Sequence, residues 1–251
     1  IDVRIINILS LLVIVMLFEI ALRSNQAASY VSSITIYPII LSPPVVQMMT
    51  HGHVLPYWLY LFVMAFALIK GRLFVASVMF GLALAARQPS VFLAPLLAIY
   101  VYNTTSLVEF IRYTLASALT FAAVVMPFAV WTGVEFWVQT YMNTSSILYD
   151  AFLIHQINGS GLVYHLGFVE ILKYIQLIII LAGAVVIARN SNKDMSWFIY
   201  FSAIVYIWAV FFNSYVARYI YIPAIILMSF AVATSFSVNM APGKGGIKSA
   251  Q

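Results

Sequence analysis

Cysteine is absent from the 251 residues, and charged side chains are scarce, at 8% of the chain. Without cysteine there is no disulfide framework, no thiolate metal site and no thiol nucleophile. Soluble domains carry about 25% charged residues, so this chain lies far outside their range. Its net charge of +5 comes from basic residues that stand singly at the ends of apolar runs, which excludes a nucleic-acid-binding protein.

What remains is mostly apolar. Hydrophobic residues make up 64% of the chain, and the mean hydropathy is +1.03. Many apolar runs approach the roughly 20 residues that a helix needs to cross a bilayer core. Unbroken runs such as Leu177 to Ile187 argue against the alternating strands of a membrane β-barrel. We therefore predict an integral membrane protein with an all-α fold, a polytopic transmembrane helical bundle.

About nine spans are expected from the lengths of the apolar runs. They are Ile5–Leu22, Ala27–Ser42, Val54–Ile69, Leu73–Ala86, Val91–Val101, Tyr113–Trp131, Ile171–Ala188, Trp197–Phe212 and Ile220–Val238. Pro38 and the pair Pro43-Pro44 kink or end the second span, which leaves open that this segment is re-entrant.

Alternation of these spans places most basic residues on one face of the membrane. That face holds Arg23, Lys70, Arg72, Arg112, Arg189, Lys193, Lys244 and Lys248, and the other holds Arg4, Arg87, Lys173 and Arg218. The positive-inside rule makes the first face cytoplasmic. Residues 1–240 are then one transmembrane domain with one long extracytoplasmic loop at about 132–168, and 241–251 are a disordered cytoplasmic tail.

The long loop is rich in aromatic residues, which favours interfacial helices at Glu135–Tyr141 and Ser146–Ile154. The chain begins with Ile1 and not with methionine, so we expect an N-terminal part of the protein to be missing.

Three acid–base pairs have helical spacing and are expected to be structural. They are Glu19 with Arg23, Glu109 with Arg112, and Glu170 with Lys173. Spacings of i,i+3 and i,i+4 place such side chains next to each other on one helix face.

Arg87 and Arg218 lack such partners and fall on the face where basic residues are disfavoured. A guanidinium offers a planar fork that suits phosphate, so a membrane-borne phosphate would explain both residues. The alternative is that each side chain only extends to lipid headgroups. Arg218 follows Tyr215 in an aromatic segment that also fits an interfacial belt.

The four histidines and two loop carboxylates complete the polar candidates. His51 and His53 form an HxH pair that can bind metal, donate to a phosphate or sugar, or simply be hydrated. A metal site is not expected, because further ligands would come only from the distant residues His155, His165, Asp150 or Glu135. Glu135 and Asp150 are also weak candidates for a general base.

The stretch from Met48 to Leu97 resembles the middle of the GT-C membrane glycosyltransferases, above all the polyprenol-phosphate-mannose-dependent mannosyltransferases. In it His51-Gly52-His53 leads into an apolar helix, a Lys70-Gly71-Arg72 hairpin follows, and Arg87-Gln88-Pro89 closes the next helix. Asn158-Gly-Ser resembles a later Asn-x-Ser loop of the family, and Tyr215 to Pro223 resembles its last aromatic and basic helix. Two departures are the missing first loop, which carries the catalytic acidic residue in the family, and His51 where Gln or Asn is common.

The resemblance implies a hexosyltransferase that moves a sugar, mannose by this likeness, from a polyprenyl-phosphate carrier to a lipid or glycan acceptor. It implies an active face outside the cytoplasm, in a plasma or endoplasmic reticulum membrane, and a catalytic base upstream of Ile1. The substrate-binding residues would be His51, His53, Arg87, Gln88, His155, Asn158, His165, Tyr215 and Arg218. No cofactor other than the lipid-linked donor is implied. The alternatives are a transporter or flippase of an anionic lipid or lipid-linked sugar, and a non-catalytic subunit with a membrane partner.

Overall fold

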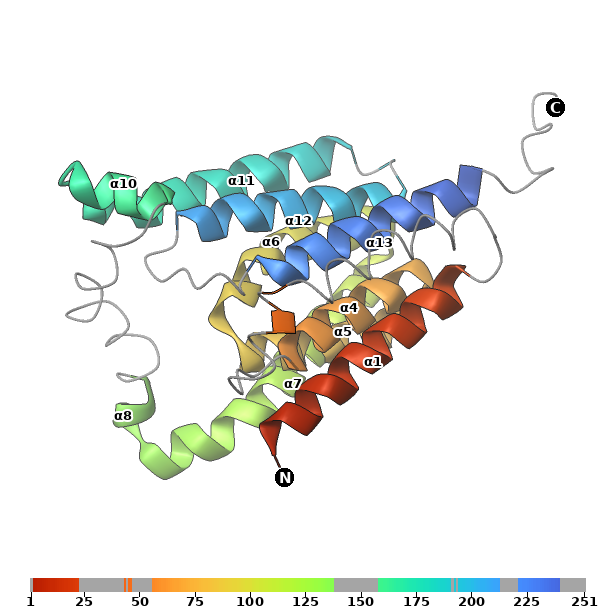
Figure 1. The fold of residues 1–251 in the computed structure, drawn as a ribbon, viewed down its shortest axis with the longest axis horizontal. Coiled ribbons are helices and arrows are strands. Elements are labelled where there is room, and N and C mark those ends of the chain that lie inside the picture. The colour runs from red at the N-terminus through yellow and green to blue at the C-terminus, as the bar shows by residue number, and fades with distance from the viewer. Residues whose placement is uncertain are drawn as a thin grey trace.

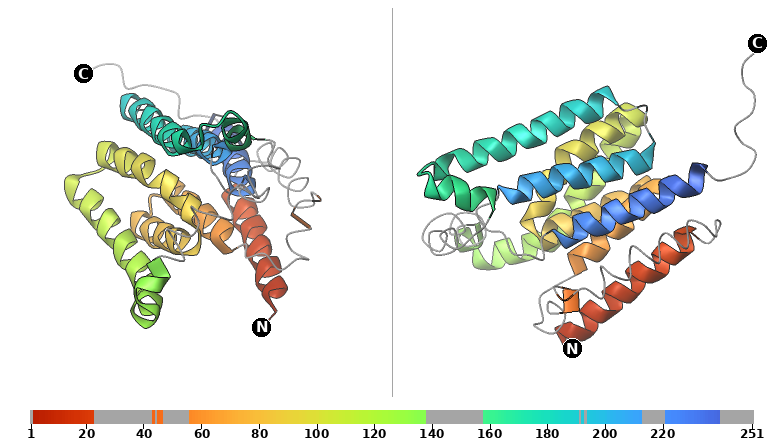
Figure 2. Two further views of the ribbon diagram at one scale, coloured as in Figure 1. Left: turned by 90° about the vertical axis from the view of Figure 1, so that its left-hand side faces the viewer. Right: turned by 45° about the horizontal axis from the view of Figure 1, so that its top comes forward.

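The computed structural model describes residues 2–22, 43, 45–46, 56–137, 158–190, 192, 194–212 and 221–239. This described part is helical and contains no β-strand, and its long helices lie side by side in one bundle (Figure 1; Figure 2). The α-helices are α1 Val3–Leu22, α4 Pro56–Ile69, α5 Leu73–Ala86, α6 Ala94–Thr104, α7 Leu107–Thr132, α8 Val134–Trp137, α10 Gly159–His165, α11 Leu172–Arg189, α12 Met195–Phe211 and α13 Ile222–Asn239. Two 3-10 helices are η1 Gln88–Leu93 and η4 Val169–Ile171.

The predicted all-α fold is therefore confirmed for the described residues, and each predicted span among them overlaps a helix. By length and composition, three helices of the described part could cross a membrane, namely α1, α7 and α11. Helices α4, α5 and α12, the run Pro89–Thr104 and the part Ile222–Ser235 of α13 are apolar but shorter. The predicted span Ala27–Ser42 and the predicted interfacial helix Ser146–Ile154 lie outside the described residues.

The predicted span Val91–Val101 was wrong in its start. The chain from Gln88 to Leu93 forms η1, and α6 begins only at Ala94. Prolines set this boundary, because Pro95 lies in the first turn of α6, where its missing N–H has no intrahelical partner to lose.

Helix α7 begins earlier than the predicted span Tyr113–Trp131. The Ser106 side chain accepts a hydrogen bond from the Glu109 backbone N–H at 3.2 Å and starts the helix at Leu107. Glu109 then forms the predicted ion pair with Arg112, at 2.8 Å. The predicted span did not include this polar turn, but in the structure the turn is the first one of α7.

Glu170 and Lys173, which were expected to be structural, form no ion pair with each other in the described part of the chain. Glu170 lies in the 3-10 helix η4, outside α11, and the Lys173 ammonium lies 5.2 Å from the centre of the Tyr174 ring. The predicted i,i+3 contact requires one continuous α-helix, and here the helix type changes between the two residues. Arg23, which would pair with Glu19, lies outside the described residues.

Side-chain contacts fix the direction in which each helix runs. The hydroxyl of Ser117 in α7 donates to the Ser77 carbonyl of α5, and further along both helices Gly81 of α5 lies against Thr120 of α7, so these two helices run parallel. The Gln176 amide of α11 donates to the Ala209 carbonyl of α12, which makes these two helices antiparallel. A hydrogen bond between the hydroxyls of Ser196 in α12 and Thr234 in α13 shows that these two helices are antiparallel as well.

The bundle therefore has two distinct ends, visible at the left and right of Figure 1. Helices α4 and α13 begin, and α5 and α12 end, at what we call the Arg87 end. The opposite end, which we call the Lys70 end, carries the α4–α5 hairpin and the starts of α7 and α12. Among described basic residues, Lys70, Arg72, Arg112 and Arg189 lie at the Lys70 end and Arg4, Arg87 and Lys173 at the other, as the predicted alternation required.

The hairpin between α4 and α5 is closed by Gly71. Its φ of +67° lies in the left-handed region that favours glycine. The Gly71 N–H donates to the Leu68 carbonyl at 3.0 Å and the Arg72 N–H to the Ala67 carbonyl at 2.8 Å, the pattern of a Schellman motif. The basic hairpin predicted from Lys70-Gly71-Arg72 is thus a tight turn between antiparallel helices.

Aromatic rings pack α1 and α13 against α4 in the core. Phe62 of α4 lies with its ring centre 4.8 Å from that of Phe230 in α13, and Phe18 of α1 lies 5.5 Å from Phe230. All three side chains are fully buried. On the other side of the core, the Tyr100 ring of α6 stacks on Phe198 of α12 at 4.0 Å.

Helices α5 and α7 approach each other closely at Gly81. A Cβ built on Gly81 would lie 2.5 Å from the Ser117 carbonyl oxygen and 2.7 Å from the Thr120 Cβ. Small residues at four-residue spacing, here Ser77, Gly81 and Ala85, allow such close packing of membrane helices.

We expect Gly81→Val to destabilise the protein by about 1–3 kcal/mol, because the Ser117 backbone cannot yield to the added side chain. Thermal unfolding of the purified protein in detergent measures the loss. The matched control is Ala118→Val, at an exposed position of α7, which should change stability by less than about 0.5 kcal/mol. Equal melting temperatures of Gly81→Val and wild type would contradict this packing.

Candidate functional site

Arg87 stands where α5 ends. It is the C-cap residue, its N–H donates to the Ala83 carbonyl at 3.1 Å, and its backbone is extended, with φ −154°. Pro89 follows in η1 and has no N–H with which to continue the α-helical ladder. The chain therefore turns at Arg87 and leaves this half-buried side chain at the Arg87 end of the bundle.

Tyr206 of α12 is the centre of what we call the arginine–tyrosine cluster, made of Arg87, Tyr57, Tyr206 and Tyr221. The Tyr206 hydroxyl of α12 interacts with that of Tyr57 in the first turn of α4, and with the charge of Arg87 and the hydroxyl of Tyr221. Tyr57 and Tyr206 are 1% and 2% exposed, so their hydroxyls are held inside the apolar bundle. Four separate elements thus bring one cation and three hydroxyls to one place.

Two further buried polar groups lie on the same elements. The N–H of Ser90 in η1 donates to the Arg87 carbonyl at 3.2 Å, and the Ser90 hydroxyl is buried without a hydrogen-bond partner among the described residues. The indole N–H of Trp58, beside Tyr57 in α4, is also buried without a partner in that part of the chain. Buried donors of this kind usually have a partner, such as water or a ligand.

The cluster is suited to an anion. A guanidinium only donates hydrogen bonds, and tyrosine, serine and indole groups can all donate to an acceptor oxygen. In an environment from which water is largely excluded, charge-assisted bonds from Arg87 to a phosphate oxygen would be strong.

The structure describes only some of the predicted site residues. His51, His53, Asp150, His155, Tyr215 and Arg218 lie outside the described residues, and of Gln88 only the backbone is described. Within the described part, no group of three His, Asp or Glu side chains could hold a metal ion.

Asn158 is described and has a structural task. Its Oδ1 atom accepts hydrogen bonds from the Gly161 N–H at 2.9 Å and from the Ser160 hydroxyl at 2.7 Å, which caps the start of α10. The next residue, Gly159, lies against the rings of Phe211 and Phe212, so α10 is docked on the end of α12. This brings Asn158 to the Arg87 end of the bundle, where its side chain caps α10.

His165 and Glu135 lie at exposed positions. His165 is in the last turn of α10, with its ring 5.7 Å from the ring centre of Tyr164. Glu135 is in the short helix α8, which covers the first part of the predicted interfacial helix Glu135–Tyr141. The structure shows no contact between either residue and the arginine–tyrosine cluster.

Sequence reasoning missed Tyr57, Tyr206 and Ser90. Each lies in or beside an apolar run and contributes little to a hydropathy pattern. One signal was present: Tyr57 and Tyr206 each lie at the end of a predicted span that faces the same side as Arg87. A polar side chain at that position inside an apolar run could have been assigned to the same site.

Comparison with known proteins identifies one family. The family model described as Glycosyltransferase family 87 matches residues 1–214, which is most of the chain. None of the curated proteins and none of the solved structures compared with the chain matches it.

The assignment of Asn158 as a cap can be tested by amide hydrogen exchange in the peptide that contains α10. Asn158→Ala removes the acceptor and should cost about 1 kcal/mol locally, which corresponds to roughly fivefold faster exchange. Asn158→Asp and Asn158→Ser keep a capping oxygen and should exchange at nearly the wild-type rate. Equally fast exchange in all three variants would show that the amide is needed for another contact.

Proposed function

The chain belongs to glycosyltransferase family 87, a GT-C-type membrane glycosyltransferase family, and on this premise we propose that it transfers mannose from a polyprenyl-phosphate carrier to a lipid or glycan acceptor. The observation that carries the proposal is the position of Arg87 among buried hydroxyl groups at one end of the helix bundle. The transfer takes place at that end, which we assign to the extracytoplasmic side of the membrane.

The chemistry explains why such a cluster is useful. An acceptor hydroxyl attacks the anomeric carbon of the sugar, the bond from that carbon to the phosphate oxygen breaks, and the acceptor proton passes to a general base. The polyprenyl phosphate leaves with one more negative charge than it carried in the donor. Arg87, together with Arg218, holds this phosphate and stabilises the charge as it develops.

The hydroxyls of Tyr57 and Tyr206 have a supporting part in this proposal. Each can donate a hydrogen bond to a phosphate or sugar oxygen, and each is fixed by packing on a separate helix. Because the Arg87 side chain is half-buried, its attraction to an anion is stronger than it would be in bulk water.

The membrane side follows from the distribution of charge. Four described basic residues lie at the Lys70 end and three at the Arg87 end. The four include Lys70 and Arg72, the two basic residues of the α4–α5 turn. Positive residues gather on the cytoplasmic side of membrane proteins, so the Arg87 end is assigned to the opposite side.

Truncation of Arg87 tests the function. Arg87→Ala should lower the turnover of radiolabelled polyprenyl-phosphate mannose by about 10²- to 10³-fold, the effect of losing one donor to a developing anion. Arg87→Lys should fall between this variant and wild type, because a point charge replaces the planar fork. Arg189→Ala, at the exposed far end of α11, is the matched control and should retain wild-type turnover.

Each variant is first compared with wild type by thermal unfolding, so that loss of folding is recognised. Unchanged turnover in both Arg87→Ala and Arg218→Ala would refute the proposed phosphate site. Turnover of a glucose donor in place of the mannose donor would keep the site and change the sugar.

The membrane side can be tested separately, because the chain has no native cysteine. Leu166→Cys lies at the Arg87 end and Lys70→Cys in the α4–α5 turn, both at exposed positions. A membrane-impermeant maleimide should label Leu166→Cys in intact cells and Lys70→Cys only after permeabilisation. The reverse labelling pattern would place the Arg87 end in the cytoplasm.

A further inference from the structure

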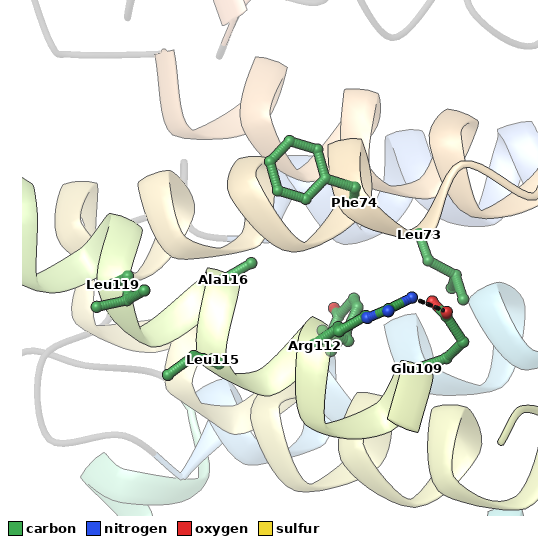
Figure 3. Close-up of a pocket in the computed structure, with 8 residues that line it drawn as sticks. Leu73, Phe74, Glu109, Arg112, Leu115, Ala116 and Leu119 are labelled. Carbon is green, nitrogen blue, oxygen red and sulfur yellow. Dashed lines mark hydrogen bonds and ion pairs between the residues drawn. The ribbon is translucent and has the colours of Figure 1, made fainter. Parts of the chain in front are cut away.

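A groove lies between α5 and α7 at the Lys70 end of the bundle, where Figure 3 shows side chains of the two helices facing each other across an open space. Its volume of about 450 Å³ is within the range of roughly 300–1,000 Å³ typical of ligand sites. The lining residues are Leu73, Phe74, Glu109, Arg112, Tyr113, Leu115, Ala116 and Leu119.

One part of the groove is polar and lies next to the basic α4–α5 turn. Arg112 and Glu109 form their 2.8 Å ion pair there, as the dashed line in Figure 3 marks. Arg72 and Lys70 lie in the turn that leads directly into Leu73, and both are exposed. The guanidinium of Arg72 forms no hydrogen bond or ion pair with any residue that the structure describes. Three cations therefore stand against one carboxylate.

The Tyr113 side chain supplies a second polar observation. It lines the groove and is only 4% exposed, yet its hydroxyl has no hydrogen-bond partner among the described residues. A buried hydroxyl without a partner is costly, and a ligand oxygen would satisfy it.

The other part of the groove is apolar and open. Phe74, Leu115 and Leu119 are 73%, 55% and 60% exposed, although α7 is long and apolar enough to cross a membrane. On a membrane-spanning helix such side chains face hydrocarbon chains. A ligand in this groove must therefore have a charged part near the turn and an apolar part along α7.

We propose that this groove binds one phospholipid with an anionic headgroup. Its phosphate lies at Arg72 and Arg112, and an acyl chain follows Phe74, Leu115 and Leu119 toward the middle of the bundle. A water-soluble phosphate is disfavoured by the apolar walls. A zwitterionic headgroup is disfavoured because Glu109, the single carboxylate of the lining, is already paired with Arg112.

This site is separate from the proposed transfer site. Arg72 and Arg87 bound the same helix at opposite ends, and at a rise of 1.5 Å per residue they are about 20 Å apart. Lipid binding in the α5–α7 groove does not depend on which sugar donor the protein uses.

Native mass spectrometry of the delipidated full chain, titrated with phosphatidylglycerol or phosphatidylcholine, tests the proposal. Wild type should retain one phosphatidylglycerol with at least tenfold preference over phosphatidylcholine. Arg72→Gln should reduce this preference several-fold, and Arg72→Gln with Arg112→Gln should abolish it. Arg189→Gln removes a cation at the same end of the bundle but outside the groove, and it should retain the full preference.

Blocking the groove gives an independent measurement. Ala116→Phe adds a ring to its wall and should reduce retention of phosphatidylglycerol at least tenfold, whereas Ala118→Phe, on the exposed face of α7, should not. Arg72 is exposed and has no described partner, so Arg72→Gln should fold normally, as its melting temperature will show. Unchanged lipid preference in the double arginine variant would overturn the proposal. Displacement of phosphatidylglycerol by equimolar polyprenyl phosphate would also overturn it, because the groove would then belong to the donor.

Discussion

Much of the structure depends on the fixed length of α5. Gly71 ends the preceding turn with a left-handed backbone, and Pro89 stops the helical ladder after Arg87. The helix between these two boundaries has only 14 residues, which corresponds to about 21 Å. The basic turn and Arg87 are thereby held at opposite ends of one rigid element, with the lipid groove beside one end and the arginine–tyrosine cluster at the other.

The position of α5 within the bundle is set by its small residues. Gly81 allows the backbone of α7 to approach, and the Ser117 hydroxyl donates to the Ser77 carbonyl across the contact. In a membrane, association of helices depends on such close packing, because lipid tails are as apolar as leucine. On its other side, α5 packs against α4, whose core rings contact α1 and α13. Both proposed sites therefore depend on the same inter-helix contacts.

The sequence predicted the helices well because apolar runs are long and their ends are marked by Gly71, Pro89 and charged residues. It also singled out Arg87, since a basic residue at that end of a span departs from the distribution that the positive-inside rule predicts. The start of α6 was wrong because a hydropathy pattern cannot distinguish a 3-10 turn from an α-helix. Glu170 and Lys173 form no ion pair because a change of helix type separates them, and their i,i+3 spacing in the sequence does not reveal this change.

The cluster around Arg87 could not be assembled from the sequence. Tyr57 and Tyr206 are 149 positions apart, and only the packing of α4 against α12 brings their hydroxyls together. The α5–α7 groove was equally hidden, because the local pair Glu109–Arg112 is explained completely by helical spacing. Tertiary contacts decide which residues Glu109 and Arg112 face across the groove.

The composition of the arginine–tyrosine cluster restricts what it can bind. Its described members, one guanidinium and three phenol groups, can all donate hydrogen bonds, and none is a carboxylate, so an anion is favoured over a cation or an amine. An acceptor hydroxyl is neutral and needs no permanent cation, whereas a phosphate gains negative charge when it leaves a sugar. Under the proposed function, this cluster of donors would serve one part of the transfer, the stabilisation of the leaving phosphate. We infer that Arg87 acts on the donor side of the transfer and that recognition of the acceptor belongs to other residues.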